Sequence, residues 1–408
     1  MSVIKPFKAL RPAAGKARNV SCVPYDVIYT SEARETIADN PESFLRVTRP
    51  EADLPKDAEP TGDEILERAR QNLERLIEQN TLAQDTEAAI FVYRLDTGEH
   101  AQTGIVGCFS IDEYDRNLIK RHEKTRPDKV KDRTDHMLAV GAQTGLIFLA
   151  YRNTDRLRDL ISAAAATEPV YDFKCPQGVG QTVWRITDTA PWIGAFAEVP
   201  AIYVADGHHR VESAKLARDI RRSENPDHTG AEEYNFVVAG VFPSEDLRIM
   251  PYNRVVKDLN GLSEEEFMAR LTAEFAVSSC DIKSPDERGT VCLYLNGKWY
   301  SLSFDPAGID RSDPIGSLDV SLLQNRVLSP ILNIGDPRTD DRIAFVGGAR
   351  GTAELERMVD EGDAAVAFSM FATTMDDLFS VADIDEIMPP KSTWFEPKLK
   401  DGLLVHLI

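Results

Sequence analysis

The junction around residues 201–222 constrains the fold of this chain more than any other feature. An apolar run, Ala201–Ala205, ends at Asp206-Gly207, and the next residues place Val211, Ala214 and Ala217 on one face of a helix. A buried strand that passes directly into an amphipathic helix is typical of α/β proteins. Apolar strand-like segments recur at 145–151, 236–242 and 364–370 among segments with helical periodicity. We therefore expect an α/β protein with a mixed sheet.

The N-terminal part of the chain is expected to form one domain, residues 1–259. Its helices are expected at 31–38, 62–80, 134–142 and 155–166, and its strands at 4–10, 20–28, 43–47 and 182–186. Segments 88–95 and 104–111 flank Asp96-Thr97-Gly98 and predict an antiparallel hairpin.

The pattern of expected helices and strands changes at Asn260-Gly261, and this change predicts a second α/β domain, residues 260–408. It is expected to contain a helix at 263–275, a hairpin that turns at Asn296-Gly297, and a long helix at 318–331. Segments 342–346, 352–359, 364–370 and 373–381 then predict the order strand, helix, strand, helix.

Charge and composition exclude several classes of function. The formal net charge is −20, so the average surface repels a nucleic-acid backbone, and we expect no nucleic-acid partner. The five cysteines are scattered and include no C-x-x-C pair, which predicts reduced thiols. No apolar run is long enough to span a bilayer, and the first residues have no apolar signal region, so we expect a cytoplasmic protein without a membrane partner.

The strongest candidate site follows the strand that ends at Asp206. Gly207 breaks the strand, and His208, His209 and Arg210 occupy the first turn of the next helix. Cations are unfavourable at this positive helix end, whereas a phosphate could accept hydrogen bonds from the backbone and from Arg210. The alternative is that Asp206 only caps the helix and that both histidines are surface residues. Zinc binding is less favoured, because adjacent histidines do not easily bind one ion.

A second candidate site is the basic segment from Lys120 to Arg133. It contains seven Lys or Arg residues against three Asp or Glu residues, in a chain that is acidic overall. Within it Glu123 lies between His122 and Lys124, and a carboxylate among cations stays ionised and could act as a base or metal ligand. The alternative is a solvated loop.

A carboxylate near the N-terminus is a third candidate. Asp26 follows Val23-Pro24-Tyr25 at the end of an expected strand. Open α/β sheets carry their ligands at the ends of strands. On its own this residue also fits a structural turn aspartate.

Several motifs resemble those of a known prokaryotic family, domain of unknown function 1015, from end to end. The matching segments are IKPFKALRP, VPYDVI, RHEKT, VKDR, ADGHHR, MPYNRVV, DPRTD and MPPKSTWFEPKL. The D-G-H-H-R segment is also similar to that of the archaeal free serine kinase, within the ParB and sulfiredoxin-like superfamily. That resemblance implies a nucleotide-binding core, whose first strand corresponds to IKPFKAL and whose phosphate site corresponds to residues 206–210. The kinase has a catalytic glutamate shortly after its first strand, but here Arg11-Pro12 leads into Ala13-Ala14-Gly15, with no acid.

Three functions are compatible with these features. The first is a phosphotransferase that uses ATP or ADP with Mg²⁺ on a small hydroxyl metabolite, with free serine as a candidate. The second is a nucleotide-dependent regulatory protein of the ParB type, and the third is a small-molecule phosphatase. The expected partners are a nucleotide and a small-molecule substrate. The candidate catalytic residues are Glu123, Asp26 and His122, and the candidate phosphate-binding residues are Asp206, Gly207, His208, His209, Arg210, Lys124 and Arg133; no side chain is assigned to a metal.

Overall fold

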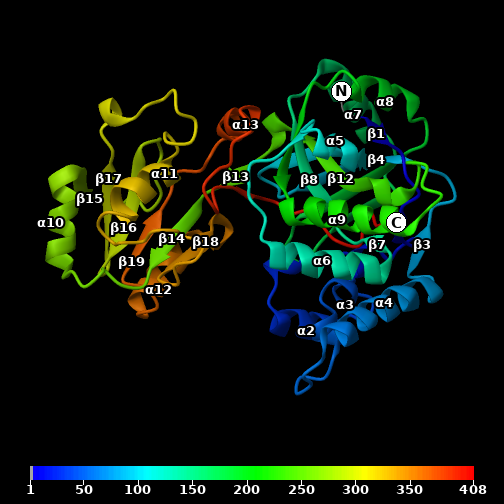
Figure 1. Ribbon diagram of the computed structural model, residues 1–408, viewed down its shortest axis with the longest axis horizontal. Coiled ribbons are helices and arrows are strands. Elements are labelled where there is room, and N and C mark those ends of the chain that lie inside the picture. Colours follow the sequence, from blue (N-terminus) through cyan, green and yellow to red (C-terminus); the bar gives the residue numbers. More distant parts are fainter. Residues whose placement is uncertain (1–2) are drawn as a thin grey trace. The chain divides into compact units, whose positions relative to one another are not determined.

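The computed structural model describes residues 3–408 and divides into two compact units (Figure 1). Unit 1 contains residues 3–121, 125–247 and 397–408, and unit 2 contains His122–Lys124 and Arg248–Glu396. The chain therefore leaves unit 1 and returns to it for the last residues.

Unit 1 is built on a nine-stranded sheet. The sheet is mixed, and the sequence predicts this mixed character. The strand order is β6-β11-β8-β12-β5-β4-β10-β9, with β1 beside β5. Two neighbouring pairs, β11 with β6 and β12 with β8, are parallel, and the others are antiparallel. The strands are β1 (Ile4–Lys5), β4 (Ile90–Asp96), β5 (Ala101–Ser110), β6 (Ile119–Lys120), β8 (Ile147–Tyr151), β9 (Tyr171–Lys174), β10 (Gly180–Ile186), β11 (Ile202–Asp206) and β12 (Phe236–Pro243).

The main core of unit 1 lies between this sheet and four helices. The helices are α5 (Ile111–Asp115), α7 (Asp155–Ala165), α8 (Ala190–Phe196) and α9 (His208–Glu224). The face of α9 that the sequence predicts to be apolar, Val211, Ala214 and Ala217, is buried in this core. Burial of that face fixes which way the first turn of α9 points.

A helical layer continues unit 1 beyond α9. Helix α6 (Pro127–Val140) contacts both α9 and α4 (Gly62–Glu78), and Figure 1 shows it between them. Helices α2 (Thr30–Asp39) and α3 (Leu45–Thr48) complete a second core with α4. Two short pairings join distant segments: β2 (Leu10–Pro12) with β3 (Leu82–Gln84), and β7 (Ala142–Gln143) with β21 (His406–Leu407).

The predictions of strands at 20–28 and 43–47 are wrong. In the segment 20–28 only Cys22 makes an isolated bridge, to Asp401, and Tyr25–Val27 is a 3-10 helix. The expected strand at 43–47 is helix α3, whose Leu45 and Val47 are buried against neighbouring helices. Short apolar runs do not distinguish a strand from a buried helical turn, and here tertiary packing decides.

Unit 2 contains a six-stranded antiparallel sheet in the order β15-β17-β16-β19-β14-β18. The strands are β14 (Tyr252–Val256), β15 (Ala276–Ser279), β16 (Thr290–Leu295), β17 (Lys298–Ser303), β18 (Ile343–Gly347) and β19 (Val366–Ser369). The helices are α10 (Glu264–Glu274), α11 (Asp319–Leu323), α12 (Gly351–Asp360) and α13 (Met375–Asp383). The hairpin predicted at Asn296-Gly297 is confirmed, and both residues have the positive φ of a type I′ turn.

The long helix expected at 318–331 is shorter and irregular. Helix α11 ends at Leu323 and continues as a π-helical turn, η6 (Gln324–Leu328). Hydrogen-bond slippage of this kind leaves the apolar periodicity nearly unchanged, so the sequence does not reveal it.

The boundaries of unit 2 differ from the expected domain 260–408 at both ends. Strand β14 is an interior strand of the unit 2 sheet, so this unit already begins at Arg248. At the other end, Val405 pairs with Leu10 and His406 with Gln143, so the last residues belong to unit 1. Both differences arise from pairings between segments that are distant in sequence.

All five cysteines are free thiols. Within residues 3–408, the helices are too short or too polar to cross a bilayer.

Candidate functional site

The strand-turn-helix predicted at residues 201–222 is present. Strand β11 ends at Asp206, Gly207 forms the N-cap with φ of 93°, and α9 begins at His208. This left-handed backbone favours glycine, because a side chain would be strained there. Asp206 Oδ1 accepts a hydrogen bond of 2.8 Å from the backbone amide of Gly207, which holds the turn closed.

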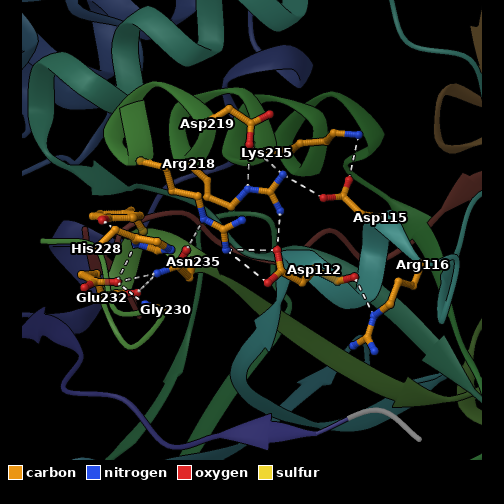
Figure 2. Close-up of polar contacts among 12 residues, drawn as sticks. Asp112, Asp115, Arg116, Lys215, Arg218, Asp219, His228, Gly230, Glu232 and Asn235 are labelled. Atoms are coloured by element: carbon orange, nitrogen blue, oxygen red, sulfur yellow. Dashed lines mark hydrogen bonds and ion pairs between the residues drawn. The ribbon is translucent and has the colours of Figure 1, made fainter. Parts of the chain in front are cut away.

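Ion pairs anchor the C-terminal half of α9 to α5 (Figure 2). The buried Arg218 donates to Asp112 at 3.0 Å and pairs with Asp115 at 2.8 Å. Lys215 also pairs with Asp115, at 2.8 Å, and Arg222 pairs with Asp112 at 3.0 Å. These contacts resist sliding or rotation of α9, so its first turn is held in a defined position.

The carboxylate of Asp206 pairs with a lysine near the C-terminus. Lys398 Nζ lies 2.5 Å from Asp206 Oδ2. Burial alone would raise the pKa of Asp206, but Lys398, and to a smaller extent Arg210, outweigh it and lower this pKa to about 2. Both oxygens of Asp206 are therefore engaged within the protein.

Arg210 forms a buried ion pair with Asp401. Its Nη1 and Nη2 donate to the two carboxylate oxygens at 2.9 and 3.3 Å, and the side chain of Asp401 is 3% exposed. Burial opposes the charge on Arg210, but Asp401 outweighs it and raises the pKa of the guanidinium. A Cβ on Gly145 would lie 1.7 Å from Arg210 Nη1, so the pair occupies space that only a glycine leaves open.

A small cavity of about 30 Å³ lies beside this ion pair, and Arg210, Gly145, Arg133, His136 and Tyr25 line it. The Tyr25 ring lies between two cations, with its centroid 4.2 Å from the guanidinium carbon of Arg133 and 5.5 Å from that of Arg210. Two guanidinium groups thus share one aromatic ring beside the cavity, and each is paired with a carboxylate, Arg210 with Asp401 and Arg133 with Asp132.

The two histidines of the motif contribute little positive charge. His208 is buried, and this burial lowers its pKa to about 4, so it is neutral at physiological pH. His209 Nε2 accepts a hydrogen bond of 3.0 Å from the backbone amide of Arg126, and an accepting nitrogen carries no proton. Of the three residues in the first turn of α9, Arg210 is therefore the one that supplies a positive charge.

The structure brings part of the predicted set together in unit 1. Asp26, next to Tyr25, is exposed, and its charge acts on both Arg210 and Asp401. Arg133 pairs with the exposed Asp132 at 2.8 Å and lines the cavity.

The remaining candidates belong to unit 2, which contains His122, Glu123 and Lys124. The backbone carbonyl of His122 accepts from Met388 at 2.8 Å, and His122 Nε2 lies 3.4 Å from the Thr393 hydroxyl. The basic segment is thus divided between the two units, and Thr125 onward belongs to unit 1.

Sequence reasoning missed Lys398, Asp401 and Gly145 as members of the site. The two charged residues lie 192 and 191 positions from their partners, so no local pattern connects them. The nearest available signal was the family marker at 388–399, which includes Lys398.

Together these observations define a mixed α/β protein with an arginine-lined site at a strand-to-helix junction. The chain belongs to the family described as "Protein of unknown function (DUF1015)", whose model matches residues 4–321.

Solved structures with similar chains have low identity to this one. A conserved hypothetical protein from Pyrococcus furiosus is 13% identical with a TM-score of 0.36, over 74% of this chain and 95% of its own. Free serine kinase in complex with AMP is 14% identical with a TM-score of 0.36, over 73% and 91%. SbnI from Staphylococcus aureus, truncated at its C-terminus, is 12% identical with a TM-score of 0.39, over 74% and 87%. No curated protein matches the chain.

Proposed function

We propose that unit 1 binds the phosphates of ATP or ADP beside the first turn of α9, in a ParB and sulfiredoxin-like core. The observation that carries this proposal is the arrangement of Arg133 and Arg210 around Tyr25 at one cavity. The positive end of a 17-residue helix adds to the field of the two guanidinium groups. The D-G-H-H-R resemblance supports the same assignment.

The two arginines have different roles in this proposal. Arg210 is already neutralised by the buried Asp401, so it positions the site and adds hydrogen-bond capacity more than net charge. The partner of Arg133 is exposed, and an exposed pair is worth only about 0–1 kcal/mol, so Arg133 can exchange Asp132 for a phosphate at little cost.

The proposed reaction is phosphoryl transfer to a small hydroxyl metabolite, with L-serine as the first candidate acceptor. This chemistry depends mainly on positioning and positive charge, which the site supplies. A carboxylate must accept the proton of the hydroxyl group, and Asp26 is the candidate in unit 1; Glu123, with His122 next to it, is the candidate from the sequence and belongs to unit 2.

Asp26 is also a carboxylate of unit 1 that could contribute to holding Mg²⁺, because it is exposed, whereas the oxygens of Asp206 and Asp401 are engaged by Gly207, Lys398 and Arg210. Mg²⁺ commonly takes one or two carboxylates and completes its shell with substrate phosphates and water, and it neutralises charge on the phosphates.

Binding is tested by calorimetry with ADP and ATP on the full chain. Arg133→Met should weaken affinity by about ten- to a hundredfold, the typical value of a charge-assisted contact. Arg116→Met is the matched control, because Arg116 is an exposed arginine of the same unit that donates to the backbone carbonyl of Asp112 and does not line the cavity. The proposal would be contradicted if Arg133→Met bound ADP and ATP with unchanged affinity, or if the wild type bound no nucleotide.

Turnover distinguishes the alternatives. Phosphorus NMR of the protein with Mg²⁺, ATP or ADP and L-serine should show phosphoserine, and Asp26→Asn should abolish it. Nucleotide binding without any transfer would favour the regulatory alternative, and release of inorganic phosphate from a phosphorylated metabolite would favour the phosphatase.

A further inference from the structure

A second cavity lies wholly within unit 2, with a volume of about 380 Å³, which is in the size range of small-metabolite sites. Strands β14 and β18 form one wall. Arg254 pairs with Phe345 in the antiparallel register, so both side chains point to the same face of the sheet and both line the cavity. The opposite face of these strands, with Val255 and Val346, packs on α12 in a hydrophobic cluster that includes Leu355.

Arg254 is a buried cation on an interior strand. It is 4% exposed, and its polar partners are two backbone carbonyls, Tyr252 O and, at 3.1 Å, Lys391 O. Its guanidinium carbon lies 5.4 Å from the centroid of the Phe345 ring. Among residues 3–408 no carboxylate pairs with it, and burial lowers its pKa to about 9. Buried cations in proteins normally have an anionic partner, so this arginine lacks the group that its environment requires.

A buried hydroxyl lines the same cavity. Ser321, in α11, is 5% exposed, and within residues 3–408 its Oγ has no hydrogen-bond partner. Such a group is costly to leave unsatisfied, and in native proteins it commonly indicates a ligand or a functional constraint. The π-helical turn η6 follows directly, and π-turns inside helices are frequent at functional sites.

The charged residues that line the cavity determine the charge of a ligand that would fit it. At the rim Arg338 pairs with Asp336 at 2.7 Å, so the two charges cancel. Inside, Arg254 supplies one uncompensated positive charge. The remaining walls are mainly apolar and include Val320, Ile343 and Pro389, so a ligand with one anionic group and a small apolar body complements the cavity.

We propose that unit 2 binds a small organic oxyanion, whose carboxylate or phosphate group pairs with Arg254 and accepts a hydrogen bond from Ser321. This site is separate from the phosphate site proposed in unit 1, involves none of its residues, and stands whether or not that proposal holds.

The test uses the full chain with two sets of probes followed by ligand-observed NMR and calorimetry. Pyruvate and succinate probe the carboxylate source, and inorganic phosphate and glycerol phosphate probe the phosphate source. We expect one set to bind at millimolar concentration or more tightly. Arg254→Met should weaken binding at least tenfold, and Ser321→Ala should weaken it several-fold while leaving the fold intact. Arg326→Met is the matched control, because Arg326 also contacts a backbone carbonyl, Gly308 O, and an aromatic ring, Phe304, but does not line the cavity.

A stability measurement separates a ligand-binding arginine from a structural one. Replacement of an unpaired buried charge by an apolar side chain of similar length should leave the thermal midpoint of the ligand-free protein unchanged or higher. A lower midpoint in Arg254→Met together with unchanged probe binding in Ser321→Ala would mean that Arg254 only clamps the backbone at Lys391, and would overturn the proposal. Absence of binding by every probe to the wild type would overturn it as well.

Discussion

Arg210 is a residue for which the sequence predicts a ligand contact but which also stabilises the fold. From the sequence its side chain was expected to donate to a bound phosphate. In the structure it lines the cavity but is ion-paired with Asp401 in a buried environment. Substitution of Arg210 therefore tests stability before it tests binding, which is why Arg133 is the better probe of the phosphate site.

Arg210→Ala should lower the free energy of unfolding by about 3–5 kcal/mol, because it leaves the carboxylate of Asp401 buried without a partner. Urea denaturation of the full chain measures this change. The double variant Arg210→Met with Asp401→Leu removes both charges and should recover most of the loss. If Arg210→Ala alone is as stable as the wild type, the pair contributes nothing and the assignment of Arg210 as a structural residue is wrong.

Buried histidines make stability depend on pH, and burial lowers the pKa of His136, His208 and His406. Burial lowers the pKa of both His136 and His208 to about 4, against about 6.5 in the unfolded chain. As the pH falls below about 6.5 the unfolded chain binds protons that the folded chain excludes, so stability is lost between about pH 6.5 and pH 4. The upper limit is about 3 kcal/mol for each histidine at pH 4.

Thermal midpoints across this pH range measure the effect. His136→Gln and His208→Gln should each flatten the decrease, because glutamine takes up no proton. His100→Gln is the control, since its ring is partly exposed and its Nε2 donates to the Asp246 carbonyl oxygen at 2.9 Å. A decrease of the same steepness in all three variants would show that other groups cause it.

At the scale of elements, α9 is positioned by contacts along its whole length. Its apolar face is buried in the main core, its C-terminal half is tied to α5 by Arg218, and its first turn meets the C-terminal segment through Arg210. The C-terminal segment 397–408 is therefore part of the site, although it has little regular secondary structure of its own.

Removal of residues 397–408 should prevent unit 1 from folding stably. The segment contributes the apolar side chains Leu399, Leu403, Leu404 and Val405, all at most 5% exposed, and their burial is worth together about 6–12 kcal/mol. That is similar to the total stability of a typical domain, about 5–15 kcal/mol. Circular dichroism and denaturant titration of the truncated chain measure the loss. Lys398→Met in the full-length chain, which removes the ion pair with Asp206 but keeps the apolar side chains of the segment, should fold. A truncated chain as stable as this control would contradict the prediction.

At the scale of the whole molecule, the formal net charge of −20 makes the binding of polyanions unfavourable. We expect no specific binding to duplex DNA at physiological salt, because the average surface potential opposes the phosphate backbone and the cations of the candidate site are largely paired. Fluorescence anisotropy with a labelled duplex measures this. Arg133→Met should make no difference in that assay, and submicromolar binding by the wild type would favour a ParB-like role.

The organisation of the chain into two units also belongs to this scale. Unit 2 lies within the sequence of unit 1, and each has its own sheet and its own candidate ligand cavity. A chain of this design can bind two different ligands, and the two proposals above assign an anionic group to both.

The amino-acid sequence by itself determined the features that depend on neighbouring residues. It predicted the mixed α/β class, the turn at Asp206-Gly207 with α9 after it, and the hairpin at Asn296-Gly297, because periodicity and glycine placement act over a few residues. Tertiary structure alone decided that 43–47 is helical, that Lys398 and Asp401 complete the site, and that Arg254 is buried without a carboxylate. These features depend on contacts between segments far apart in the chain, and no local pattern encodes which distant partner a buried charge will meet.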